Sequence, residues 1–154
     1  MARILITGSN SGFGKLAALS LARQGHQVVA TMRNLEKGEA LRDAAAAENL
    51  AIEIRPLDVC DPASIIAAIA DPNELDVVVN NAGFEVSGAV EMVDDDLLAR
   101  QFDTNVAGPL RVVRAVLPTW RERGNGTIVN VSSIAAVGPS ISSTTTACTV
   151  PSAV

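Results

Sequence analysis

Short apolar runs alternate along this chain with segments in which apolar residues recur at helical spacing. Five of the runs are short and rich in Val, Ile and Leu, as expected of strands that are covered on both faces. The predicted strands are residues 3–7, 27–31, 51–57, 75–80 and 127–131. Strands that alternate with helical segments are typical of βαβ units, so the pattern predicts an α/β fold with a parallel sheet.

The segments between the strands predict helices. One helix begins at Gly12 and can end at Gly25, and an Ala-rich helix covers residues 35–48. Asp61 followed by Pro62 is a helix-start signal, because Asp caps free N–H groups and Pro fits the first helical position. The predicted core face of the first helix consists of Phe13, Leu16, Ala17, Ser20 and Leu21.

A long helical region follows the fourth strand. Residues 94–96 are all Asp and open it, because acidic side chains favour the positive end of the helix dipole. A long helix then runs from near Asn105 to Arg123, with Pro109 close to its start, where proline is tolerated. Its predicted core stripe consists of Val106, Leu110, Val113, Leu117 and Trp120.

Composition limits the classes of function. The 154 residues suit one domain, and 48% hydrophobic with 19% charged residues is typical of a globular chain. The net charge of −5 leaves no basic surplus for binding nucleic acid. No apolar run approaches the roughly 20 residues that span a bilayer. Residues 4–6 are too short an apolar run for a signal peptide, so we expect no membrane partner and a cytoplasmic location.

The character of the sequence changes near its end. Residues 140–154 contain no charged side chain and show neither helical nor strand periodicity. We therefore expect a nucleotide-binding domain over residues 1–138 and an irregular Ser/Thr-rich tail over residues 139–154. Cys60 and Cys148 lack CxxC spacing and His26 is the only His, so we expect no metal site.

The turn after the first predicted strand is rich in glycine and reads Thr7-Gly8-Ser9-Asn10-Ser11-Gly12-Phe13-Gly14. Glycines let the backbone turn sharply and approach a ligand, and free N–H groups at the start of the next helix favour a phosphate. Gly14 and Lys15 resemble the end of a P-loop. However, Ser9 stands where that motif has Gly, and Leu16 where it has Ser or Thr. The glycine spacing also departs from GxGxxG.

The spacing of Thr7, Gly8, Gly12 and Gly14 resembles the cofactor motif of the classical short-chain dehydrogenase/reductase family. Further segments follow in that family's order: Leu57-Asp58-Val59, Asn80-Asn81-Ala82-Gly83, Asn105, and Ile128-Val129-Asn130-Val131-Ser132-Ser133. The resemblance implies a Rossmann-like, doubly wound parallel sheet with the strand order 3-2-1-4-5 and the cofactor at the carboxyl ends of the strands. It also implies that the C-terminal part of the family fold is missing.

The resemblance implies a site for a nicotinamide dinucleotide. Asp58 would accept a hydrogen bond from the adenine amino group. For Asn80 and Asn81, a plain turn at the end of the strand is the alternative to a role at the cofactor. The second strand leads into Arg33 without a carboxylate, which favours NADP(H) over NAD(H), because arginine can hold a 2′-phosphate. A surface arginine is the alternative. The predicted cofactor-binding residues are Gly8, Ser9, Asn10, Ser11, Gly12, Phe13, Gly14, Arg33, Asn34, Asp58, Val59, Asn81, Ala82 and Gly83.

Hydride transfer to or from an alcohol or carbonyl substrate also needs a group that moves a proton. In the family this is the Tyr of a Tyr-x-x-x-Lys pair, supported by a Ser and an Asn. Ser133 and Asn105 match the last two, with Ser132 as the neighbouring alternative; a turn cap or a helix N-cap is the structural alternative for each. The Tyr and Lys positions fall near Thr146 and Val150, and the chain contains no Tyr.

Two functions therefore stay open. One is an NADP(H)-dependent short-chain oxidoreductase that is inactive as the chain stands, its frame lost near residue 138 by a frameshift, a premature stop or a sequence error. The other is a non-catalytic dinucleotide-binding or regulatory module, and an unstable remnant is a third reading. The sequence does not name the alcohol or carbonyl substrate. Homo-oligomerisation stays open as well, because the family helix that packs beside the long helix is absent.

Overall fold

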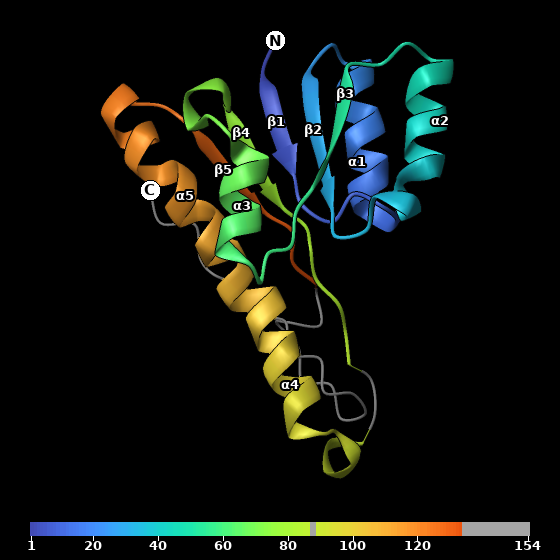
Figure 1. Cartoon of the computed structure of the whole chain (residues 1–154), viewed down its shortest axis with the longest axis vertical. Helices are drawn as coiled ribbons and strands as arrows, with labels where there is room; N and C mark the ends of the chain where they lie inside the picture. The colour runs from blue at the N-terminus through green and yellow to red at the C-terminus, as the bar shows by residue number, and fades with distance from the viewer. Residues whose placement is uncertain (87–88, 134–154) are drawn as a thin grey trace.

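The computed structural model describes residues 1–86 and 89–133. Its centre is a five-stranded sheet (Figure 1). The strands are β1 (Arg3–Ile6), β2 (Gln27–Met32), β3 (Ile52–Pro56), β4 (Val77–Asn80) and β5 (Thr127–Asn130). They lie in the order β3-β2-β1-β4-β5, and each neighbouring pair is parallel. The predicted Rossmann-like fold and its strand order are confirmed.

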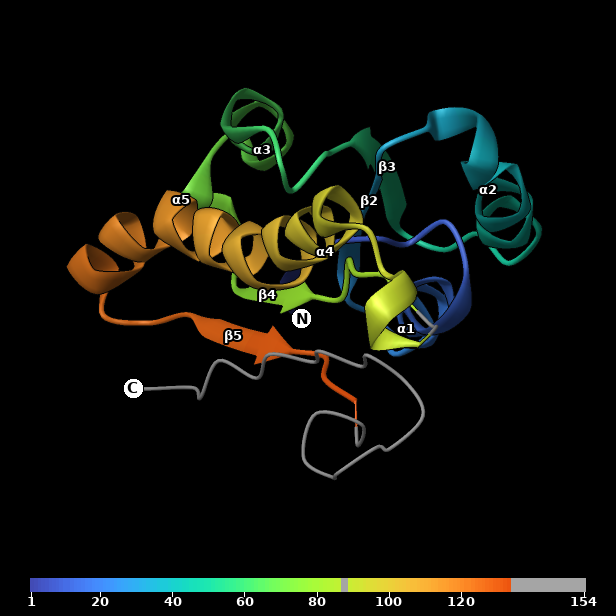
Figure 2. The same ribbon diagram turned by 90° about the horizontal axis from the view of Figure 1, so that it is seen from below.

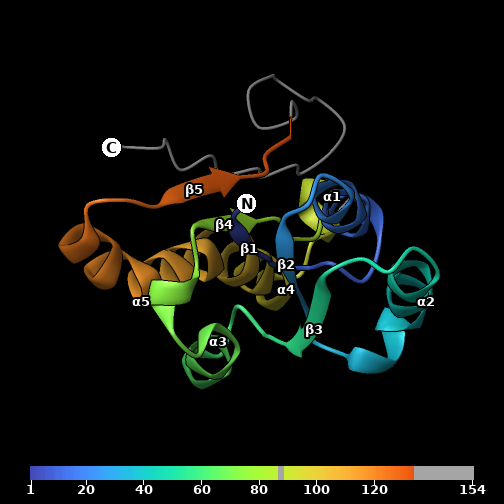
Figure 3. The same ribbon diagram turned by 90° about the horizontal axis from the view of Figure 1, so that it is seen from above.

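Helices cover both faces of the sheet, as the two end-on views in Figures 2 and 3 show. α1 (Gly12–Arg23) and α2 (Glu39–Ala47) lie on one face, and α3 (Pro62–Ile69) and α5 (Gly108–Arg123) lie on the other. The chain changes face at the crossover from β3 to β4, so the strand order reverses between β1 and β4. In open α/β sheets, ligands bind outside the carboxyl ends of the strands at this point.

The strands divide the core into two layers because their side chains alternate between the faces. On the α3 and α5 side, Leu5, Val29 and Val78 pack with Val112 and Val116. On the α1 and α2 side, the buried strand residues that pack with the helices are Ile4, Ile6, Val28, Ala30, Met32 and Val79. Burial on both faces explains why the central strands are apolar along almost their whole length.

The predicted core face of α1 is wrong at Phe13, Leu16 and Ser20, whereas the predicted Ala17 and Leu21 are half-buried against the core. Phe13 and Leu16 are 80% and 62% exposed. The helix instead buries Gly14, Ala18, Leu19 and Ala22. The buried face of α1 is therefore rotated from the predicted one, and mostly small side chains let the helix approach the sheet closely.

The predicted core stripe of α5 is also wrong, except for Trp120. The buried residues of this helix are Gly108, Val112, Val116 and Trp120. The predicted Leu110, Val113 and Leu117 are only half-buried. α5 thus carries two apolar stripes side by side, and the sheet and α3 select one of them.

α4 (Asp95–Phe102), a π-helical turn (Asp103–Ala107) and α5 form one continuous column that extends past the sheet (Figure 1). Asn105 therefore lies inside a helix, and the alternative that it caps the long helix is wrong. In α-helical register the carbonyl of Asn105 would accept from residue 109, but Pro109 has no N–H. This missing donor is a physical reason for the wider turn.

The remaining elements are short. Turns of 3₁₀ helix cover Leu35–Gly38, Pro72–Glu74 and Val90–Met92, so the helix predicted over residues 35–48 begins as a 3₁₀ turn before α2. Asp61 caps α3 as predicted, accepting from the N–H of Ala63 at 2.9 Å. Within the described ranges, no helix is both long enough and apolar enough to cross a bilayer. The tail predicted over residues 139–154 lies outside the described residues.

Candidate functional site

The glycine-rich turn between β1 and α1 is anchored to the strands on both sides of β1. The N–H of Thr7 donates to the carbonyl of Val79 on β4 at 3.0 Å, and the N–H of Ser9 donates to the carbonyl of Thr31 on β2 at 2.8 Å. The buried Ser9 hydroxyl donates back to the carbonyl of Ile6 at 3.0 Å. Ser9 therefore supports the turn from inside, and its hydroxyl is directed at the protein rather than at a ligand.

A second segment, Asn81 to Gly83 after β4, is locked against this turn. The Thr7 hydroxyl oxygen accepts from the N–H groups of Asn81 and Ala82, each at 3.0 Å. The side-chain amide of Asn81 donates to the carbonyls of Thr7 and Gly8, each at 2.9 Å. All these bonds are intramolecular, so they hold the two segments in register before any ligand binds.

Two glycines in the turn are required by close packing. Gly8 has a φ of +70°, and a Cβ there would lie 2.8 Å from the Cα of Ala82. A Cβ at Gly14 would overlap the carbonyl oxygen of Gly8 and lie 2.5 Å from the amide nitrogen of Asn81. Gly12 also has a positive φ, +53°, but the space around it is open. An open backbone at the first turn of α1 is what a phosphate cradle needs.

A cleft of about 320 Å³ lies against this turn at the carboxyl ends of the strands. The predicted residues that line it are Gly8, Asn10, Ser11, Gly12, Phe13, Arg33, Asp58, Val59, Asn81, Ala82 and Gly83. Its other lining residues include Met32, Leu57, Phe84 and Thr104. The fold thus gathers the ends of β1, β2, β3 and β4 around one cavity. The predicted Ser9, Gly14 and Asn34 are not among the lining residues.

Arg33 and Asn34 follow β2 and have different surroundings. Arg33 lines the cleft, is exposed, and has no carboxylate within ion-pair distance among the described residues. The side-chain oxygen of Asn34 instead caps the following 3₁₀ turn by accepting from the N–H of Glu36 at 2.9 Å. Arg33 is therefore the available cation at this end of the cleft, while Asn34 shapes the loop.

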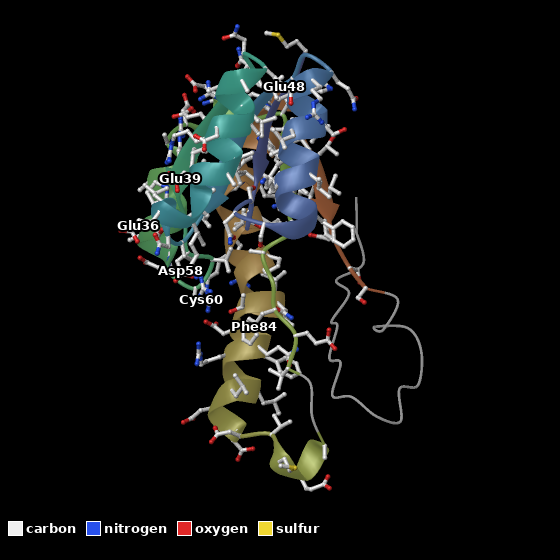
Figure 4. The ribbon with its side chains drawn as sticks, turned by 90° about the vertical axis from the view of Figure 1, so that its right-hand side faces the viewer. Glu36, Glu39, Glu48, Asp58, Cys60 and Phe84 are labelled. Atoms are coloured by element: carbon white, nitrogen blue, oxygen red, sulfur yellow. The ribbon has the colours of Figure 1, made fainter. Side chains whose placement is uncertain are left out.

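Asp58 sits at the exit of β3 in a turn of its own. Its Oδ1 accepts from the N–H of Cys60 at 2.9 Å, and its own N–H donates to the Ser64 hydroxyl at 2.9 Å. These bonds orient the carboxylate where it lines the cleft. Figure 4 shows Asp58, Cys60 and Phe84 at the same end of the sheet, near the α4–α5 column. Phe84 lines the same cleft.

Asn105 holds the backbone that continues from Gly83. Its side-chain oxygen accepts from the N–H of Phe84 at 3.1 Å, and its amide donates to the carbonyl of Phe84 at 2.8 Å. One turn earlier, the buried Gln101 donates to the same carbonyl at 3.4 Å. In the described structure, the side chain of Asn105 therefore positions the cleft wall.

Two titratable groups beside the cleft are shifted by their surroundings. Burial raises the pKa of the Cys60 thiol, and the nearby Asp103 and Asp58 act in the same direction against a hydrogen bond with Thr104. The hydrogen bond from Arg111 holds the pKa of Asp103 below its usual value, assisted by Cys60. The raised pKa keeps Cys60 in its thiol form at neutral pH.

A sequence model of the short chain dehydrogenase family matches residues 2–148, nearly the whole chain. The protein belongs to the short-chain dehydrogenase family.

Sequence similarity to individual proteins supports this assignment. The chain is 45% identical over 135 residues to the oxidoreductase YusZ of Bacillus subtilis, a match that covers 84% of this chain and 48% of YusZ. It is 42% identical over 137 residues to retinol dehydrogenase 8 of Homo sapiens, covering 85% and 44% of the two chains.

The fold is similar to the solved structure of a gluconate 5-dehydrogenase from Burkholderia cenocepacia in complex with NADP and tartrate. The TM-score is 0.82 at 30% identity, over 93% of this chain and 58% of that chain. The chain spans about half the length of the relatives that it matches.

Two of the four positions that correspond to catalytic residues of the family, Asn105 and Ser133, lie among the described residues. Asn105 faces the Phe84 backbone, as above, and Ser133 is exposed at the exit of β5. Ser132, the neighbouring alternative, is exposed as well. Thr146 and Val150, which fall where the family has Tyr and Lys, lie outside the described residues.

Three residues that support the site were not among the predicted binding residues, although Thr7 and Asn80 stand in the segments that carry the family resemblance. Thr7 links the two loops, Gln101 supports Phe84, and Asn80 donates to the Asn130 side chain at 2.9 Å. Asn80 and Gln101 each keep a buried side-chain oxygen without a hydrogen-bond partner among the described residues. The signal available for Thr7 and Asn80 was a polar residue at the end of an apolar strand. For Gln101 there was none, because its partner lies 17 residues away.

Proposed function

We propose that this protein binds NADP(H) in the cleft at the carboxyl ends of its strands, as the cofactor-binding part of an oxidoreductase that acts on an alcohol or carbonyl group. The observation that carries the proposal is the cradle formed by the glycine-rich turn and the Asn81–Gly83 segment, where a Cβ at Gly8 or Gly14 would collide with backbone. We propose residues 1–138 as the binding domain.

The cradle suits a diphosphate for two reasons. Gly12 opens α1, whose first N–H groups have no partner inside the helix and lie at the positive end of its dipole. The polar side chains of Thr7 and Ser9 are already paired within the protein, so the turn offers a ligand its backbone together with Asn10 and Ser11, which line the cleft. The related gluconate 5-dehydrogenase, similar in fold, was solved with NADP.

Arg33 supports NADP(H) over NAD(H). It lines the cleft next to the end of β2, where an acidic residue would bind a ribose 2′-hydroxyl and repel a phosphate. Its guanidinium has no carboxylate partner among the described residues. It can therefore form a charge-assisted pair with a 2′-phosphate without first breaking an ion pair.

When bound, the nicotinamide would supply or accept the hydride. We propose that Asp58 and Val59 contact the adenine end, that Asn105 positions the Phe84 backbone, and that Ser133 faces the substrate oxygen. With Thr146 and Val150 in the family's Tyr and Lys positions and no Tyr in the chain, we propose binding with negligible turnover. A non-catalytic dinucleotide-binding module is the second candidate, and the same lack of Tyr favours it.

The test is a fluorescence titration of the 154-residue chain with NADPH and with NADH. We expect NADPH to bind more tightly, and Arg33→Ala to weaken NADPH binding about tenfold with little effect on NADH, because only NADPH carries the 2′-phosphate. Arg42→Ala is the matched control, since Arg42 is exposed on α2 and does not line this cleft.

Three outcomes would contradict parts of this proposal. Equal affinity for the two cofactors would overturn the NADP(H) preference. The absence of binding to either cofactor would overturn the dinucleotide site itself. Robust NADPH-dependent reduction of carbonyl compounds by the 154-residue chain would overturn the proposed lack of turnover.

A further inference from the structure

Two segments far apart in the sequence meet at the side of the cleft where Asp58 lies. One is the turn of Asp58, Val59 and Cys60 after β3, and the other is the π-helical turn Asp103–Ala107. Asp58, Val59 and Thr104 line the same cleft. The two segments touch directly, with the Cys60 sulfur 3.4 Å from the Thr104 hydroxyl.

Arg111 joins these segments from outside the cleft. Its Nη1 donates to the carbonyl of Val59 at 3.3 Å and to the carbonyl of Asp103 at 3.5 Å. Its Nη2 donates to the Asp103 carboxylate at 2.5 Å. One guanidinium thus bridges the turn after β3 and the π-helical turn, although Arg111 itself is not among the residues that line the cleft.

The long helix and the turn after β3 also pack closely at Gly108. Gly108, one turn before Arg111, packs so tightly against Val59 that a Cβ there would lie 2.8 Å from a methyl carbon of Val59. A guanidinium presents donors in a planar fork that reaches acceptors in two directions at once. A lysine ammonium at the same position cannot reproduce this fixed geometry.

We propose that Arg111 is a positioning residue for the adenine subsite: it holds the Asp58–Val59 turn against the π-helical turn, and so sets where the Asp58 carboxylate and the Val59 backbone meet the adenine ring. This inference rests on the proposed function, because it assumes that a dinucleotide binds in this cleft. Arg111 itself does not line the cleft, and it acts on the adenine subsite through its bonds to Val59 and Asp103.

The experiment compares Arg111→Met with Arg114→Met in the 154-residue chain. Arg114 is the matched control, because it is exposed on the same helix and makes no hydrogen bond or ion pair among the described residues. Both variants remove one positive charge from the same helix, so the change in net charge is the same in each. The probes are NADPH, 2′,5′-ADP and inorganic pyrophosphate, the last two measured by displacement of NADPH.

We expect Arg111→Met to weaken NADPH and 2′,5′-ADP binding by the same factor, about tenfold, because both carry adenine. The affinity of pyrophosphate, derived from its displacement of NADPH and corrected for the new NADPH affinity, should equal that of the wild type, because pyrophosphate occupies only the glycine cradle. Arg114→Met should change each affinity less than twofold. Arg111→Lys, which keeps the charge but not the fork, should give an intermediate loss.

Two results would overturn the inference. If Arg111→Met behaves like Arg114→Met, Arg111 does not position the subsite. If all three ligands weaken equally, its role is general stability of the fold. Should Arg111→Met fail to fold, Arg111→Lys decides, and wild-type affinities in that variant would also overturn the inference. Failure of the wild type to bind NADPH is a separate result that removes the proposed function and this inference with it.

Discussion

β4 and β5 are neighbouring parallel strands of equal length with similar sequences, Val-Val-Val-Asn and Thr-Ile-Val-Asn. Their surroundings nevertheless differ. β4 lies between β1 and β5 and is buried along most of its length, whereas β5, among the described residues, pairs with β4 alone and is mostly exposed. Val79 and Val129 are register partners, yet Val79 is 8% exposed and Val129 42%. The burial of an apolar strand residue is therefore set by its neighbours in space.

The same contrast separates the two halves of the candidate site. The end of β4 leads into Asn81, whose amide is bonded to the glycine turn, so the cofactor cradle is fixed from several sides. The end of β5 leads into Ser133, which is exposed. The two strand ends thus differ in exposure: Asn81 is half-buried against the glycine turn, and Ser133 is exposed.

Gly14→Ala should disrupt the packing between the glycine turn and the Asn81–Gly83 segment, and we expect it to have the largest effect. The new methyl group would overlap the Gly8 carbonyl and the Asn81 amide, which cannot move without losing buried hydrogen bonds. We expect the free energy of unfolding to fall by about 3 kcal/mol and NADPH binding to be lost. Chemical denaturation and cofactor titration measure the two effects.

Gly25→Ala is the control for that substitution. Gly25 also has a positive φ, +85°, but the space around it is open and it lies away from the cleft. It should cost about 1 kcal/mol of stability from backbone strain and leave cofactor affinity unchanged. If Gly14→Ala proved no more harmful than Gly25→Ala, close packing would not be what defines the cradle.

Exchanging Val for Thr at the two register partners should sharpen the contrast between the strands. At Val79 the hydroxyl would be buried on the α1 and α2 face, and we expect a loss of about 1–2 kcal/mol. At Val129 the same change should stay within about 0.5 kcal/mol, because the hydroxyl is hydrated. Urea unfolding of both variants tests this, and equal losses would mean that β5 is covered in solution.

The smallest effect concerns Asp103, where a hydrogen bond from Arg111 lowers the carboxyl pKa. A lowered pKa in the folded state adds stability above the pKa of the unfolded chain, and that stability is lost as the pH falls through the folded value. The melting temperature of Asp103→Asn should therefore lie slightly below that of the wild type at neutral pH. The difference should vanish in acid, below the usual aspartate range. A difference that grew toward acid pH would contradict the assigned direction.

The strands and the glycine turn could be predicted from the sequence because each is a local pattern. A short run of β-branched residues such as residues 77–79 favours a buried strand, and the turn at Gly8 sits directly between a strand and a helix. The core faces of α1 and α5 could not be predicted in the same way. Each helix carries more than one apolar stripe, and the predictions at Phe13 and Leu110 chose the stripe with the larger side chains.

The hydrogen-bond partners of the polar residues could not be predicted from the sequence either. The resemblance predicted a catalytic role for Asn105, and the structure places its side chain on the Phe84 backbone beside the cleft; its alternative role as a helix cap was wrong, because the column continues through it. Nothing local indicates that its amide binds the Phe84 backbone 21 residues away, or that Arg111 reaches Val59 across 52 residues. Such pairs depend on where the sheet places separate loops.

The sequence by itself determined the alternation of strands and helices, the glycine turn, and the polar character of the residues that follow the strands. These properties depend on neighbours along the chain, through hydrophobic periodicity and backbone freedom. The tertiary structure decided which helix face is buried, which strand stands at the edge, and which amide or guanidinium holds which loop. Those outcomes depend on contacts between residues distant in sequence, which form only when the parallel strands bring their carboxyl ends together.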